Sequence, residues 1–166
     1  MRTMREVMSG MVFKFKSLPS SYYNLGEAAA FAMLALGEDA PGDVKKLWRT
    51  WVTVGRVSFE FDGVTYVIPE GFMTDFSSVP RLFRWLVSPV GQPHQVAGVV
   101  HDFLYSSGAV TRKQADAAFK AAAAAAGSPS LRAALMYRAI RLGGWFAWRN
   151  NRAKLLALGS RWRFVD

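Results

Sequence analysis

The residues of this chain best suited to chemistry are two histidines and a few carboxylates in its middle third. His94 and His101 are its two histidines, and a helix predicted from Pro93 to about Ser106 places them two turns apart on one face. Asp102 follows His101 directly, and Tyr105 lies one turn further along. A histidine beside a carboxylate can act as a general base or hold a hard metal ion, because the carboxylate fixes the tautomer and raises the basicity of the ring.

The preceding loop, residues 71–78, offers a carboxylate and three hydroxyls that could approach this helix. One interpretation is that Asp75, His101 and Asp102 converge as candidate catalytic residues, surrounded by supporting side chains of Ser77, Ser78, Tyr105, Asp116 and His94. The alternative is that Asp75 and Ser78 cap the helix beginning near Val79, while His101 and Asp102 hydrogen-bond the loop to the helical core. Both interpretations stay open at this point, and so does the question of whether the protein is an enzyme.

Several kinds of site are excluded or disfavoured by composition and spacing. The chain has no cysteine, so it has no thiol nucleophile, disulfide or thiolate metal site. It also lacks a G-x-S-x-G elbow, an H-E-x-x-H motif and a glycine-rich phosphate loop. His94 and His101 lie about 10 Å apart along a helix axis, too far to share one ion. A divalent metal is therefore not supported by the spacing, and we predict no cofactor.

The elements that must position these residues indicate an α+β fold in one domain, residues 1–166. An alternating strand is predicted at Met11 to Lys16, a turn at Pro19 to Asn24, and a helical arm at Leu25 to Leu36. The strongest β signal is a hairpin within Trp51 to Ile68, where Asp62-Gly63 supplies a turn between two alternating runs. The sequence thus predicts a small antiparallel hairpin or sheet followed by four to five helices.

The predicted helices have recognisable ends. Thr111 and Gln114 form a capping box, and Gly127 follows an alanine-rich run as a C-terminal cap. Gly143-Gly144 is expected to separate two further helices. The helices are expected at Arg81 to Val87, Pro93 to Ser106, Thr111 to Ala126, Leu131 to Leu142 and Trp145 to Leu158.

Positive charge is concentrated at the C-terminal end. The formal net charge is +9, of which Leu131 to Asp166 contributes eight basic residues and one acidic residue, a balance of +7. This indicates an acidic partner or an arginine-rich solvated helix face. Arginine and tryptophan are enriched at protein interfaces and also suit nucleic acid; we expect a protein interface made by Trp145, Trp148, Arg149, Arg152, Arg161, Trp162 and Arg163. No segment is long and apolar enough to predict a membrane span.

Three ordered blocks resemble the signature of an uncharacterised family of tailed-phage proteins. Residues 67–81 (VIPEGFMTDFSSVPR) are similar to its V-P-x-G-F-x-T-D-F-x-S-V-P block, residues 101–105 (HDFLY) to H-D-x-L-Y, and residues 112–119 (RKQADAAF) to R-x-x-A-D-x-x-F. The resemblance covers about residues 51–144, leaving an N-terminal extension with the helical arm (1–50) and a basic, aromatic C-terminal helix and tail (145–166). It implies that Asp75, Ser78, His101, Asp102, Tyr105 and Asp116 matter, without assigning them an activity.

The resemblance also implies a biological setting, because such proteins are encoded in tailed phages and prophages near tail or lysis genes. We therefore expect a virion-associated structural or assembly protein of the tail or baseplate, present in the host cytoplasm during assembly and then in the virion. Its expected partners are other phage structural proteins. The alternative is a hydrolase that acts on host peptidoglycan through Asp75, His101 and Asp102, with the cell-wall polymer as partner. A nucleic-acid binder using the basic C-terminal region is a third, less favoured reading.

Overall fold

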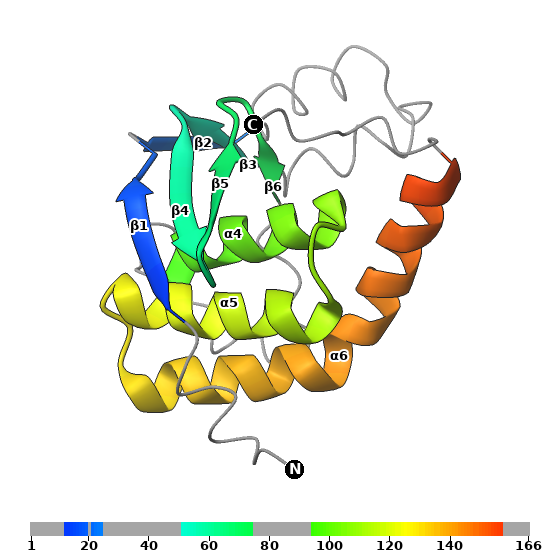
Figure 1. Cartoon of the computed structure of the whole chain (residues 1–166). Coiled ribbons are helices and arrows are strands. Elements are labelled where there is room, and N and C mark those ends of the chain that lie inside the picture. Colours follow the sequence, from blue (N-terminus) through cyan, green and yellow to red (C-terminus); the bar gives the residue numbers. More distant parts are fainter. Residues whose placement is uncertain (1–11, 20, 25–50, 75–93, 158–166) are drawn as a thin grey trace, which may run out of the picture.

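The computed structural model describes residues 12–19, 21–24, 51–74 and 94–157 (Figure 1). In these residues the fold is α+β, as predicted, with six strands followed by three helices. The expectation of four to five helices is not met, since the described part of the chain contains three. The helices predicted at 25–36 and 81–87 lie outside the described residues.

The first sheet is antiparallel and contains the predicted hairpin. Its order is β1 (Phe13–Ser17), β4 (Val57–Phe61) and β5 (Val64–Ile68). The hairpin turn has φ of +54° at Asp62 and +79° at Gly63. Both central residues therefore adopt the left-handed conformation that a tight two-residue hairpin turn requires, and the prediction is confirmed.

The second sheet is small, antiparallel and less visible in the sequence. It contains β2 (Ser21–Asn24), β3 (Trp51–Val54) and β6 (Met73–Thr74), with β3 in the centre. The turn predicted over Pro19 to Asn24 is wrong, because Ser21–Asn24 pairs along its whole length with β3. Two tyrosines favour a strand there, and β3, distant in sequence, supplies the hydrogen-bonding partner.

The three helices are α4 (His94–Ser107), α5 (Arg112–Ala125) and α6 (Ser130–Ala157). The predicted capping box is present: the Thr111 hydroxyl accepts from the Gln114 amide at 3.3 Å, and the Gln114 side chain accepts from the Thr111 amide at 3.0 Å. After the helix, Gly127 has φ of +90°, which lets the amides of Gly127 and Ser128 bond back to α5 carbonyls. Both predicted ends of α5 are therefore confirmed.

Helix α6 corrects one prediction, since it runs through Gly143-Gly144 as a single helix of 28 residues. Each glycine weakens a helix by about 1 kcal/mol relative to alanine, but packing can outweigh this cost. Gly144 is buried, and Arg112 donates to the carbonyls of Ile140 and Arg141, just before the glycine pair. Figure 1 shows that α6 changes direction along its length. A glycine pair permits such a bend without ending the helix.

The core lies between the first sheet and the helices. On β4, Val57, Phe59 and Phe61 are buried and alternate with half-exposed residues. Their side chains belong to one hydrophobic cluster with residues of α4, α5 and α6. Figure 1 shows α6 on the side of α5 away from the strands. One side of α6 therefore faces away from the other described elements.

Candidate functional site

The candidate site is centred on a carboxylate buried within the helical layer. Asp116 lies just over one turn into α5, on the face that also buries Ala115, Ala118 and Phe119. Its exposed fraction is 0%. The small alanines on this face let neighbouring helices approach closely, so that side chains from α4 and α6 can reach one carboxylate.

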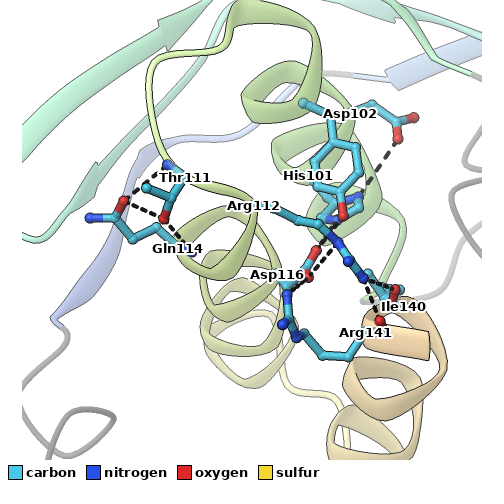
Figure 2. A network of polar contacts seen from close by, with 9 residues as sticks. His101, Asp102, Thr111, Arg112, Gln114, Asp116, Ile140 and Arg141 are labelled. Carbon is cyan, nitrogen blue, oxygen red and sulfur yellow. Dashed lines mark hydrogen bonds and ion pairs between the residues drawn. The ribbon is translucent and has the colours of Figure 1, made fainter. Parts of the chain in front are cut away.

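Asp116 accepts hydrogen bonds from both neighbouring helices (Figure 2). Its Oδ1 accepts from His101 Nε2 at 2.9 Å and from the Tyr105 hydroxyl at 2.6 Å, both on α4. Its Oδ2 accepts from Arg141 Nη1 on α6 at 2.7 Å. We call Asp116, His101, Tyr105, Arg112 and Arg141 the Asp116 cluster.

Arg112 connects the cluster to the backbone of α6. Its Nε lies 3.6 Å from Asp116 Oδ2, an ion-pair distance within α5. Its Nη2 donates to the carbonyls of Ile140 and Arg141 (Figure 2). Every group that approaches Asp116 in these contacts is a donor, so the site requires an ionised carboxylate.

The electrostatic environment stabilises opposite charges on Asp116 and His101. Burial alone would raise the pKa of Asp116, but hydrogen bonds from His101, Tyr105 and Arg141 outweigh it and hold this pKa below its usual value. Burial alone would lower the pKa of His101, but the carboxylates of Asp102 and Asp116 outweigh it and raise this pKa. The pair is therefore best described as a buried imidazolium and carboxylate.

Tyr105 is the point where the Asp116 cluster meets the second half of α6. Burial, followed by its bond to ionised Asp116, raises the pKa of Tyr105. Its ring packs edge-on against Trp148, with centroids 4.9 Å apart. A Cβ placed on Gly144 would lie 2.7 Å from the Tyr105 hydroxyl. Glycine is therefore required at position 144 to let α6 pass over this hydroxyl.

Asp102 points away from Asp116 and links α4 to the second sheet. Its Oδ2 accepts from the Thr74 hydroxyl of β6 at 2.5 Å, and its Oδ1 lies 3.9 Å from His101 Nδ1. Figure 2 shows Asp102 on the opposite side of His101 from Asp116. His101 Nδ1 is buried and makes no hydrogen bond. Asp102, whose side chain is 13% exposed, is thus the member of this chain of polar groups that lies next to the second sheet.

This geometry limits the chemistry available to the cluster. A general base must come within hydrogen-bonding distance of its substrate, whereas His101 and Asp116 are both 0% exposed. Within the described ranges, no group of three or more histidine and acidic side chains is placed to hold a metal ion. The arrangement can fix three helices and one strand relative to one another. It presents one carboxylate, that of Asp102, toward the exterior.

A second feature of the same helical layer lies on the outer face of α6. Six positions spaced by four, three, four, three and four residues are exposed: Leu131, Leu135, Arg138, Leu142, Trp145 and Arg149. We call these six residues the α6 stripe. Leu131 is 72% exposed and Leu142 is 78% exposed, and Phe146, 67% exposed, lies beside the stripe. Large apolar side chains in a continuous exposed row are characteristic of interaction surfaces.

The structure brings together some of the residues selected from the sequence. His101, Tyr105 and Asp116 are in direct contact, and Asp102 extends the same chain of polar groups. Asp75, Ser77 and Ser78 lie outside the described residues. So do Arg161, Trp162 and Arg163. His94 begins α4 and Arg152 lies within α6, but their side chains are not described.

The interface residues predicted on α6 fall on different faces of the helix. Trp145 is exposed, and the guanidinium of Arg149 lies 5.3 Å from the centre of its ring. Trp148 is instead packed against the hydrophobic core through Tyr105. Trp145 and Arg149 therefore lie on the exposed side of α6, whereas Trp148 helps to fix α6 on the domain.

Sequence reasoning missed the cationic half of the Asp116 cluster. Arg112 precedes Asp116 by four residues, a spacing typical of helical ion pairs, and a carboxylate on an alanine-rich face requires such a partner. Arg141 belongs to the basic C-terminal region, and it bonds to the buried Asp116. Thr74 is one of the three hydroxyls of residues 71–78 that were expected to approach this helix, and its bond to Asp102 agrees with the interpretation in which Asp102 hydrogen-bonds this segment to the helices.

Comparison with known proteins gives a family without an activity. Residues 52–140 match the model of a family described as "Protein of unknown function (DUF1353)". The match covers more than half of the 166 residues, and the chain belongs to this family. The matched region includes β4, all of β3 except Trp51, and every member of the Asp116 cluster except Arg141. No curated protein and no solved structure matches the chain.

Among the described residues, no helix is long and apolar enough to cross a membrane.

Proposed function

We propose that this chain is a structural or assembly subunit of a tailed-phage particle, belonging to the tail or its baseplate. The observation that carries the proposal is the α6 stripe, an exposed row of leucines, tryptophan and arginines on a helix whose other face is firmly packed. A rigid helix presenting anchoring side chains suits attachment to a neighbouring subunit. The resemblance of residues 67–81, 101–105 and 112–119 to blocks found in phage proteins supplies the setting.

The Asp116 cluster supports the same proposal by its burial. Its ionised groups are tied to one another and to the backbone of α6, which is the helix that presents the stripe. In this role, His101 and Asp116 position α6, and they need no contact with a substrate. The chain would be made in the host cytoplasm and retained in the finished particle.

The test is peptide mass spectrometry of purified particles of the phage that encodes the chain. Its copy number is measured against that of the major tail protein. A copy number that corresponds to a symmetry of the tail or baseplate is the expected result. Absence from particles, together with abundance in infected cells, would overturn the proposal.

The second candidate is a hydrolase that acts on host peptidoglycan, and one observation favours it. Asp102 is partly exposed, and its Oδ1 lies 3.9 Å from Nδ1 of His101. The purified chain would then release soluble fragments from peptidoglycan, and Asp102→Asn would abolish the release without unfolding the protein. Equal release by both proteins would exclude Asp102 from catalysis.

A further inference from the structure

The spacing of the α6 stripe is that of a helix-packing seam. Successive members are separated by three or four residues over about five helical turns, which keeps them on one side of the helix. The stripe is exposed along its length, so none of the residues that the structure describes covers it. A second helix is the element whose side chains interlock with such a row.

The charge on α6 is of one sign. Its 28 residues include five arginines and one lysine and no acidic residue. Arg138 and Arg149 lie within the stripe itself, and Arg149 covers part of the Trp145 ring. A partner that lies along the stripe must therefore place acidic groups beside Arg138 and Arg149. Without them, the two guanidinium groups would lose contact with water and gain no opposite charge in return.

Two other occupants fit this surface less well. A second copy of α6 would place basic residues opposite basic residues along the seam, which is unfavourable. Nucleic acid would satisfy the arginines, but its phosphates have no attraction for the exposed leucines of the stripe, Leu131, Leu135 and Leu142. An amphipathic helix with acidic flanks satisfies both features together.

We infer that the α6 stripe binds an acidic amphipathic helix of another protein of the particle. The partner helix carries leucine-like residues at intervals of three and four and glutamate or aspartate beside them. Leu142 and Trp145 are the central anchors, with Arg138 and Arg149 facing the acidic residues. This inference rests on the proposed function and adds the chemistry of the partner to it.

The experiment is site-specific photo-crosslinking in the full-length chain during infection. A photoreactive phenylalanine replaces Leu142 in one variant and Asn150 in the other, an exposed α6 residue outside the stripe. Cross-linked peptides are sequenced by mass spectrometry from particles and from infected-cell extracts. The expected result is one helical segment of net negative charge with apolar residues at intervals of three and four. Its yield from position 142 should exceed that from position 150 by about tenfold, as expected for the centre of an interface.

A second measurement uses the segment identified in this way. As a synthetic peptide, it should bind the purified chain, and Leu142→Asp should weaken the affinity by at least about tenfold, whereas Asn150→Asp stays within about twofold. Cross-links to a second copy, to nucleic acid or to a non-acidic segment would overturn the inference. So would the absence of cross-links from a folded Leu142 variant. None of these outcomes changes the copy number of the chain in particles, which is the quantity that tests the proposed function. The failure of this inference is therefore distinguishable from the failure of the proposed function.

Discussion

Substitution of Asp116 by asparagine tests whether the Asp116 cluster holds the helices together. The two side chains have nearly the same volume, so packing is conserved and the charge is removed. Oδ1 accepts from His101 and Tyr105, while Oδ2 accepts from Arg141 and lies near Arg112. Whichever way the amide is oriented, its NH₂ group faces donors.

The magnitude follows from these contacts. Removing one member of a buried ion pair costs about 3–5 kcal/mol, because the remaining charges are left without compensation. The partial exposure of Arg141 favours the lower part of this range, since water can solvate that guanidinium. For a chain of this size, the melting temperature should fall by about 6–20 °C.

The assay is urea unfolding followed by circular dichroism, with Glu60→Gln as the matched control. Glu60 makes a surface ion pair with Lys16 at 3.3 Å, and such pairs contribute at most about 1 kcal/mol. We expect Asp116→Asn to lower the free energy of unfolding by about 3–5 kcal/mol without changing the m-value. A loss no larger than that of Glu60→Gln would refute the claim that the cluster holds the helices in place.

The remaining predictions concern pH and the passage of α6 over Tyr105. The lowered pKa of Asp116 contributes stability that is lost as pH falls through that pKa, and the raised pKa of His101 contributes stability that is lost as pH rises through it. The difference in stability between wild type and Asp116→Asn should therefore be largest between about pH 4 and 6.5, and a difference independent of pH would contradict this. Gly144→Ala should destabilise the protein by about 1–3 kcal/mol through contact with the Tyr105 hydroxyl, whereas Gly143→Ala, on the exposed side, should be neutral or stabilising by up to about 1 kcal/mol. In a double-mutant cycle measured by urea unfolding, Tyr105→Phe should reduce the cost of Gly144→Ala, and strict additivity would show that the hydroxyl is not the obstacle.

The sequence predicted the turns and helix caps, which depend on residues close together in the chain. The hairpin turn at Asp62-Gly63 and the caps of α5 at Thr111 and Gly127 are confirmed because each requires particular residues at fixed positions. The second sheet was missed because its pairing joins Ser21–Asn24 to a strand distant in sequence. No local pattern contains the information for that contact.

The same distinction explains the outcome for α6 and for the candidate site. Gly143-Gly144 was interpreted as a helix end because glycine weakens isolated helices, but tertiary contacts with Tyr105 and Arg112 maintain the helix there. The pairing of His101 with Asp116 could not be derived from spacing, since it depends on how α4 packs against α5. The resemblance selected both positions without indicating that they touch.

The most direct test of the proposed role is the copy number of the chain in particles assembled from two phage variants. One carries Leu142→Asp within the α6 stripe, and the other carries Asn150→Asp, the same added charge on the same helix outside the stripe. We expect Asn150→Asp to be incorporated at the wild-type copy number and Leu142→Asp to be depleted from particles while remaining folded and abundant in infected cells. Equal incorporation of the two variants would contradict attachment through α6.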